Sequence, residues 1–238
     1  GIGRALAEAL QKQGNQVIIA GRRKSVLDET TAANPGMRSL TLDIENADDF
    51  QRFVSEVKAE FPALNVLINN AGIMKPENLK DGVDGLGTAE SIVAINLLGP
   101  LRLTAALMPL LMSQAHATIM TVSSGLAFVP MAMTPTYCAT KAAIHSWTQS
   151  LRRQLRDTAV EVLEIAPPYV QTELMGPHQT SDPNAMPLAE YIAETLSVLA
   201  NPPASGEILV GRVHPLRFAE RNGNYDQVYE RLNQSTGH

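Results

Sequence analysis

The sequence has little cysteine, no long apolar run and no basic stripe, and each absence excludes a class of protein. The single cysteine, Cys138, cannot form an internal disulfide, which fits a reducing compartment. No stretch approaches the roughly 20 apolar residues of a membrane span, and no secretory signal is visible. The formal net charge is -5, which argues against nucleic-acid binding. No spacing of Cys, His and acidic residues suggests a metal site. We therefore expect a cytoplasmic protein with no metal, nucleic-acid or membrane partner.

The pattern along the chain is an alternation of strand-like and helix-like segments. Of 238 residues, 45% are hydrophobic, which is enough for the core of one large domain. Strands are expected at residues 16–20, 38–42, 65–68, 117–122, 160–165 and 207–210. Helical patterns between successive strands imply right-handed crossovers and hence a parallel sheet. The sequence predicts an α/β fold.

The chain opens on Gly1-Ile2-Gly3-Arg4 and passes directly into a helical pattern. A natural protein rarely begins in the first turn of a helix. We therefore expect that a strand and a turn precede Gly1 and are absent from this sequence. Without that strand we would not expect stable folding.

Tyr137 and Lys141 are four residues apart, and Ser124 lies thirteen residues before the tyrosine. On a helix, residues four apart share a face. A cationic amine beside a phenol favours the phenolate, which would let Tyr137 exchange a proton near neutral pH. By itself the pair could equally be an ordinary surface pair.

Polar residues also follow several of the expected strands: Arg22, Asp43, Asn69 and Ser124. Parallel sheets bind ligands at the carboxyl ends of their strands. Loop residues after strands are polar in many proteins, so the placement alone is suggestive. It predicts a ligand crevice along this edge.

Taken in order, the motifs resemble the short-chain dehydrogenase/reductase family over nearly the whole chain, to about Val210. They are Gly1-x-Gly3, Arg22-Arg23, Asp43, Asn69-Asn70-Ala71-Gly72, Asn96, Ser123-Ser124 and Tyr137-x-x-x-Lys141. The resemblance implies a single NAD(P)-binding Rossmann domain over residues 1–238. Its sheet would be doubly wound and parallel, with helices on both faces in three α/β/α layers. The missing first strand would be central in that sheet.

The resemblance also implies a dinucleotide site. Arg22 stands just after the position where NAD-preferring members carry an acid, and a guanidinium there can clamp a 2′-phosphate. We therefore expect NADP(H) rather than NAD(H), although a solvated basic turn would look the same. Pro168 departs from the glycine of the family's nicotinamide loop. The implied cofactor-binding residues are Gly1, Ile2, Gly3, Arg22, Arg23, Asp43, Ile44, Asn69, Asn70, Ala71, Gly72, Tyr137, Lys141, Pro167, Val170 and Thr172.

All four members of the family's catalytic tetrad are present. By resemblance, Tyr137 is the general acid/base, Ser124 hydrogen-bonds the carbonyl oxygen, and Lys141 lowers the pKa of Tyr137 and binds the nicotinamide ribose. Asn96 would hold a water that links Lys141 to solvent. The implied function is an NADP(H)-dependent oxidoreductase, a carbonyl reductase that interconverts a carbonyl and an alcohol. The alternative is a non-catalytic NADPH-binding sensor or scaffold on the same fold.

The substrate side is less specified. The polar, proline-punctuated region of about residues 173–187 is expected to form a lid over a small-molecule carbonyl or alcohol. Apolar pocket walls are expected at Phe128, Met131, Met133, Tyr169, Leu174 and Met175. His145 and His178 are expected to be structural.

Two further expectations come from the resemblance. In relatives, the helices at residues 97–111 and 136–157 form the subunit interface. Their apolar faces would permit a homodimer or homotetramer through Leu103, Leu107, Leu110, Ala142, Ala143 and Trp147.

The region around residues 167–174 and the short tail resemble the branch often named for teichoic-acid D-alanylation. That name is not carried over as an activity, because esterification is a different reaction class from hydride transfer.

Overall fold

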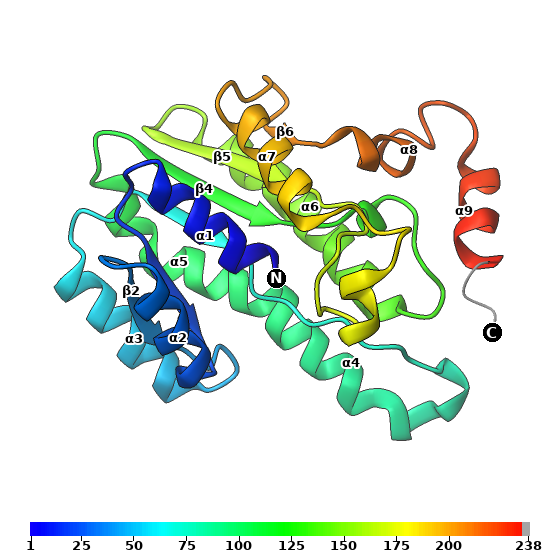
Figure 1. Ribbon diagram of the computed structural model, residues 1–238, viewed down its shortest axis with the longest axis horizontal. Coiled ribbons are helices and arrows are strands. Elements are labelled where there is room, and N and C mark those ends of the chain that lie inside the picture. The colour runs from blue at the N-terminus through cyan, green and yellow to red at the C-terminus, as the bar shows by residue number, and fades with distance from the viewer. Residues whose placement is uncertain (235–238) are drawn as a thin grey trace.

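In residues 1–234, which the computed structural model describes, six strands lie in parallel and helices cover both faces of the sheet (Figure 1). The strands are β1 (Ile18–Gly21), β2 (Arg38–Thr41), β3 (Val66–Asn69), β4 (Ala117–Val122), β5 (Val160–Ile165) and β6 (Glu207–Ile208). The expected bounds of the strands at 117–122 and 160–165 are confirmed, and the other four differ by one or two residues at an end.

The helices are α1 (Ile2–Lys12), α2 (Lys24–Ala33), α3 (Ala47–Glu60), α4 (Leu86–Val93), α5 (Gly99–Met112), α6 (Pro135–Leu155), α7 (Leu188–Leu199), α8 (His214–Arg217) and α9 (Tyr225–Gln234). Short turns of other helix types lie at Leu79–Gly85, Ala94–Leu98, Gly125–Ala127, Pro177–Ser181 and Gly211–Val213. Helices α1 and α7 pack together on one face of the sheet, while α3, α5 and α6 cover the other. This is the doubly wound, three-layer α/β/α arrangement of a Rossmann-type fold, as expected.

The sheet is divided between β1 and β3. β1 pairs with β2, and β3 begins a second sheet in the order β3-β4-β5-β6. Every residue of β1 and of β3 lines one cavity of about 2500 Å³. That volume exceeds the ~300–1,000 Å³ of a usual ligand pocket, so the cavity includes more than a ligand site. The cavity therefore takes in the gap between the two sheets as well as residues at the ends of their strands.

Two apolar clusters hold the layers together. On one face, Phe50 and Phe53 of α3 pack with Leu107 of α5 against Ile119 of the sheet. On the other, Leu6 of α1 packs with α7 residues against Ile165. In α3, the apolar residues recur at helical spacing, and Asn46 caps the helix by accepting hydrogen bonds from two backbone N–H groups. These layers fix the carboxyl ends of β4 and β5 relative to α6.

A π-turn at Ala94–Leu98 lies between α4 and α5. Pro100 has no N–H to give the carbonyl of Asn96, so the regular α-helical ladder cannot continue there. Gly99 N–H instead reaches back five residues to the Ala94 carbonyl. The turn places Asn96 in the interior, where it is 1% exposed.

Two expectations about the helical segments need correction. Leu103 and Leu107 are buried against their own sheet, so the expected subunit interface cannot use them.

Among the described residues, one helical run, Leu79–Met112, is long and apolar enough to cross a membrane by length and composition. Its inner residues, Leu103 and Leu107 included, pack in the core, so it is a core segment.

Candidate active site

Ser124, Tyr137 and Lys141 meet at the carboxyl end of β4. Tyr137 and Lys141 lie one turn apart on α6 and are 5% and 4% exposed. Lys141 Nζ lies 5.6 Å from the centre of the Tyr137 ring and donates a hydrogen bond to the Val122 carbonyl at 2.7 Å. Ser124 directly follows β4, and its side chain hydrogen-bonds Tyr137. The ordinary surface-pair interpretation of Tyr137 and Lys141 is therefore wrong.

The start of α6 explains why Tyr137 is held in place. Pro135 occupies the first turn, where its missing N–H costs nothing. The carboxylate of Glu77 accepts hydrogen bonds from the Thr136 N–H and Oγ1, at 3.1 and 2.8 Å. An anion at a helix N-terminus is stabilised by the helix dipole. The first turn of α6 is thus fixed one residue before Tyr137.

Burial dominates the electrostatics of this pair. It raises the pKa of Tyr137 to about 12, and the hydrogen bond from Ser124 lowers that pKa by a smaller amount. Burial also lowers the pKa of Lys141 to about 8. The direction for Tyr137 is the reverse of the expected one, because losing water penalises the phenolate. Tyr137 is therefore protonated at neutral pH and suited to donate a proton.

Asn96 lies beside this group and is engaged with the backbone. Its Oδ1 accepts a hydrogen bond from Ile73 N–H at 2.8 Å, and its Nδ2 donates to the Ile73 carbonyl at 2.9 Å. A Cβ added to Gly72 would lie 3.4 Å from Asn96 Oδ1 and 3.6 Å from Lys141 Nζ. Glycine at this position therefore lets the chain after β3 pass close to both side chains.

The N-terminus of α1 points backbone N–H groups into the same cavity. Gly1 is the N-cap, and no side chain caps the first turn. A Cβ at Gly3 would collide with the Asn70 side-chain amide, so only glycine fits there. A helix N-terminus of this kind attracts anions, phosphate groups included.

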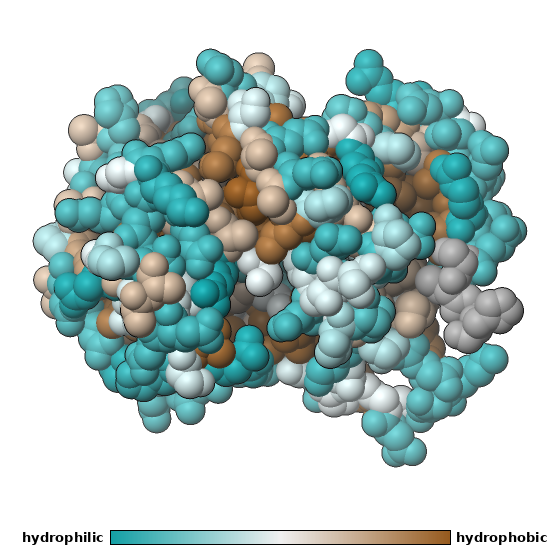
Figure 2. Space-filling model, viewed as in Figure 1, coloured by the Kyte–Doolittle hydropathy of each residue, from teal (hydrophilic) through white to brown (hydrophobic). Residues whose placement is uncertain are grey.

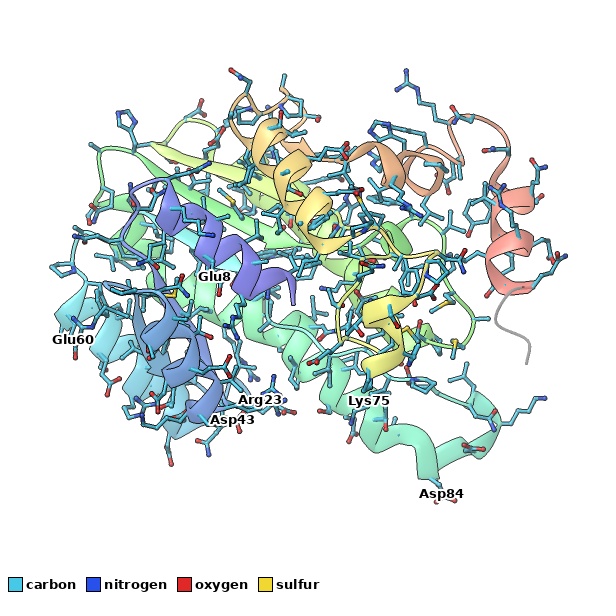
Figure 3. All side chains as sticks on the ribbon, in the orientation of Figure 1. Glu8, Arg23, Asp43, Glu60, Lys75 and Asp84 are labelled. Carbon is cyan, nitrogen blue, oxygen red and sulfur yellow. The ribbon has the colours of Figure 1, made fainter. Side chains whose placement is uncertain are left out.

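Basic residues stand where β1 ends. Arg22 Nη1 lies 3.6 Å from Glu45 Oε2, while Arg23 lines the cavity and forms no ion pair within residues 1–234. Lys24 is paired with Asp28. Asp43 follows the paired strand β2, and its carboxylate accepts a hydrogen bond from Glu45 N–H at 3.1 Å. Figure 3 shows Arg23 and Asp43 at the same corner of the molecule.

The loop after β5 completes the cavity wall. Pro167, Val170 and Thr172 line it, and the Pro167 carbonyl accepts a hydrogen bond from Gly125 N–H. Sequence reasoning missed Gln179, whose buried amide donates to the Val170 carbonyl at 2.7 Å and to Thr172 Oγ1 at 3.1 Å. No sequence signal marks Gln179, because its importance comes from the fold of the segment around it.

Of the expected cofactor-binding residues, all but Asp43 line the cavity, and so do Ser124, Tyr137 and Lys141. Asn69 is also hydrogen-bonded to Thr104 of α5 at 2.9 Å, which anchors β3. Figure 2 shows apolar side chains gathered in the middle of one face, between two polar halves.

Of the six residues expected to line a substrate pocket, five line the cavity. Met131, Met133, Tyr169, Leu174 and Met175 line the cavity. Phe128 does not, because its ring packs under the Arg217 guanidinium, 4.7 Å away, and against His145. The expectation that Phe128 is a pocket wall is therefore wrong.

A second cluster of titratable groups lies outside the cavity. His145 Nδ1 lies 2.8 Å from Glu164 Oε2 and 3.9 Å from Glu207 Oε1. The three could supply metal ligands, since their ligand atoms all lie within 4.8 Å of one another. Each of the three already has another partner, however: His145 hydrogen-bonds Glu164, and Arg217 forms an ion pair with Glu207. The structure supports the structural role that we expected for His145.

Comparison with known proteins agrees with these features. Residues 1–182 match the family model for short chain dehydrogenase. An uncharacterized oxidoreductase, DltE of Bacillus subtilis, is 39% identical over 236 residues, which are 98% of this chain and 92% of the relative. An uncharacterized oxidoreductase of Staphylococcus aureus is 28% identical over 205 residues, covering 85% and 87% of the two chains.

Solved structures show the same fold. A short-chain dehydrogenase from Streptomyces avermitilis superposes with a TM-score of 0.82 at 23% identity, covering 100% of this chain and 94% of the other. One from Burkholderia cenocepacia, in complex with NADP, has a TM-score of 0.80 at 25% identity and covers 98% and 92%. The chain belongs to the short-chain dehydrogenase family and is an oxidoreductase.

Proposed function

We propose that this enzyme uses NADP(H) to interconvert a small-molecule carbonyl and the corresponding alcohol, with Tyr137 as general acid/base. The observation that carries the proposal is a single cavity. It takes in the Ser124, Tyr137 and Lys141 group, the open N-terminus of α1 and the basic turn at Arg22-Arg23. A dinucleotide has the same three parts: a reactive ring, a pyrophosphate and an adenosine end.

The residues fit such a cofactor on two structural grounds. The first turn of α1 has no side-chain cap, and the space beside Gly1 is open. Arg23 is a cation in the cavity wall without an ion-pair partner among the described residues, which favours a phosphate ligand. The α1 N-terminus would hold the pyrophosphate, and Val170 and Thr172 would hold the nicotinamide carboxamide. When bound, the nicotinamide supplies or accepts a hydride.

The protein's part in the reaction is proton transfer and orientation. Tyr137 gives its hydroxyl proton to the carbonyl oxygen in the reducing direction, and its raised pKa keeps that proton available at neutral pH. Ser124 donates a hydrogen bond to the same oxygen and stabilises the charge that develops on it. Lys141 binds the nicotinamide ribose.

Asn96 would support a water between Lys141 and solvent. Its side-chain amide is already used on Ile73. Its backbone carbonyl would hold the water, since Pro100 has no N–H to donate to it. The segment of residues 173–187 would act as the lid, with Gln179 holding it to Thr172.

We place the enzyme in the cytoplasm. Ala143 and Trp147 of α6 are partly exposed, so they could contribute to the interface of a homodimer or homotetramer.

The test is NADPH oxidation with a panel of aldehydes and ketones. Tyr137→Phe should lower kcat by about 10²–10⁴-fold, the usual contribution of general acid–base catalysis. Its NADPH affinity should be unchanged. Ser124→Ala is the companion variant and should lose activity without losing NADPH binding. Turnover unaffected by Tyr137→Phe would contradict the role of Tyr137, while NADPH binding with no carbonyl reduced would favour a sensor or scaffold.

A further inference from the structure

The C-terminal helix α9 closes the cavity beyond Tyr137. Val228, Arg231 and Leu232 of this helix line the same cavity as Ser124 and Tyr137. Leu232 packs against the apolar cluster that contains Tyr137 and Met131. Helix α9 lies beyond the residues matched by the family model, which ends at residue 182. The family motifs therefore say nothing about this wall.

Asn233 ties α9 to the loop between Ser124 and Tyr137. Its Oδ1 accepts a hydrogen bond from Ala132 N–H at 2.6 Å, and its Nδ2 donates to the Pro130 carbonyl at 3.2 Å. The Nδ2 group also donates to the Tyr229 carbonyl of its own helix at 2.9 Å. One amide thus serves both a donor and an acceptor of the loop while it is anchored on α9.

The loop held by Asn233 carries part of the substrate wall. Met131 and Met133 both line the cavity. Met131 N–H donates to Cys138 Sγ at 3.3 Å, and Thr134 N–H donates to the Met131 carbonyl at 3.0 Å. The loop is thereby fixed to α6 on one side and to α9 on the other. Figure 1 shows α9 at the end of the molecule where this loop lies.

Apart from Arg231, the side chains that line this end of the cavity are mainly apolar and adaptable. Methionine side chains fill irregular space and accommodate flexible ligands. Such a lining favours a hydrocarbon chain over a polar or compact group, and each buried methylene strengthens binding roughly fourfold. The lining residues at this end are Leu126, Met131, Met133, Met175, Leu216 and Leu232.

We propose that α9 determines substrate specificity: Leu232 contacts a flexible apolar chain attached to the carbonyl carbon, and Asn233 is a positioning residue that holds the Met131 wall against that chain. This inference rests on the proposed carbonyl reductase activity and names its substrate class.

The first experiment measures kcat/KM for unbranched aldehydes from butanal to decanal. In the wild-type enzyme, kcat/KM should rise with chain length through KM. Leu232→Ala should lose about tenfold with decanal through a higher KM, with little change for butanal or for NADPH affinity. Gln227→Ala, an exposed residue on the same helix, is the control and should match the wild type. Equal length profiles for wild type and Leu232→Ala would overturn the inference.

The second experiment separates positioning from general stability. Asn233→Ala removes both hydrogen bonds to the loop, whereas Asn233→Asp keeps the acceptor for Ala132 N–H. Backbone amide exchange at residues 131–134 should accelerate at least tenfold in Asn233→Ala and much less in Asn233→Asp. The KM for decanal should follow the same order, with kcat for butanal unchanged. Identical exchange in all three proteins would contradict the positioning role.

A third measurement distinguishes failure of this inference from failure of the proposed function. Binding of 1-octanol, followed by saturation-transfer NMR, needs no turnover. We expect binding to the wild type, and a clear loss of signal in Leu232→Ala. If the enzyme reduces carbonyls and the α9 variants change neither kcat/KM nor octanol binding, this inference alone is refuted. If no carbonyl is reduced, the proposed function is refuted. The octanol signal then tests the apolar site alone: binding that Leu232→Ala weakens supports the site, and binding that it leaves unchanged refutes it.

Discussion

Arg217 holds Glu207 by both carboxylate oxygens. Its Nε lies 3.1 Å from each oxygen, and its Nη2 lies 2.9 Å from Oε1. Glu207 is buried at the start of β6, and the Arg217 guanidinium also covers the Phe128 ring. The pair therefore joins the last strand, α8 and the loop that follows Ser124. It places the start of the C-terminal region, and hence α9, against the substrate cavity.

We expect Arg217→Met to destabilise the fold strongly. The substitution keeps most of the side-chain volume but removes the bidentate partner of the buried Glu207 carboxylate and leaves only His145 Nδ1, 3.9 Å away. Breaking a buried ion pair typically costs about 3–5 kcal/mol. The free energy of unfolding in urea measures the effect. Arg221→Met is the matched control, because Arg221 is exposed, forms no ion pair within residues 1–234 and lies over the Phe218 ring, 6.0 Å from its centre. A loss no larger than that of the control would show that the pair contributes little.

Cofactor choice should depend on Arg22 and Arg23. Replacing both by Ala removes charge-assisted hydrogen bonds to a 2′-phosphate, each worth about 1.5–3 kcal/mol. The KM for NADPH should therefore rise at least tenfold, while the KM for NADH stays the same. Lys24→Ala is the control, because Lys24 is already paired with Asp28 on the helix surface. An equal rise for both cofactors would indicate that these arginines do not recognise the phosphate.

The buried Lys141 should make stability rise with pH. Its pKa is about 8 in the folded protein, against 10.5 for the free side chain. Between these values the unfolded chain binds the proton and the folded chain does not, so stability increases with pH by up to about 1.4 kcal/mol per pH unit. Tyr137 acts oppositely, but only above about pH 10, the value of a free phenol.

Urea unfolding at about pH 7.0, 8.5 and 9.5 measures this slope. The first value lies below the pKa of Lys141 in the folded protein, and the other two lie between that pKa and the pKa of the free side chain. Lys141→Met should remove the rise while keeping the side-chain volume. Parallel stability profiles for the wild type and Lys141→Met would rule out a depressed lysine pKa as the source of the slope.

Reduction and oxidation should differ in pH dependence. With the pKa of Tyr137 at about 12, the phenolate fraction increases about tenfold per pH unit across the neutral range. Oxidation of an alcohol needs the phenolate, so its kcat/KM should rise with a logarithmic slope near 1 between about pH 6 and 8. Reduction needs the protonated tyrosine and should be flat there. An oxidation profile that levels off near pH 7 would mean that the lysine outweighs burial after all.

Much of the fold followed from local patterns. The strands at residues 117–122 and 160–165 have the expected bounds, since their apolar runs and their end signals agree. Helix α9 escaped prediction because its apolar residues are few and interleaved with charged ones. Its helical form depends on packing against Val129 and Ala219.

The candidate site divides in a similar way. The motif residues around Tyr137 and Lys141 could be found because four-residue spacing on a helix fixes their relation. The roles assigned to individual site residues remain predictions. Gln179 and Asn233 could not be found, because their partners are backbone groups supplied by other segments of the fold.

The sequence by itself determined the family, the parallel α/β sheet and the side chains that gather at the ends of its strands, because helical spacing and strand order are local properties. Only the tertiary structure decided the direction of the Tyr137 pKa and the part of the cavity wall that α9 forms. Burial and hydrogen bonds to distant segments control both, and neither is a property of a residue's neighbours in the chain.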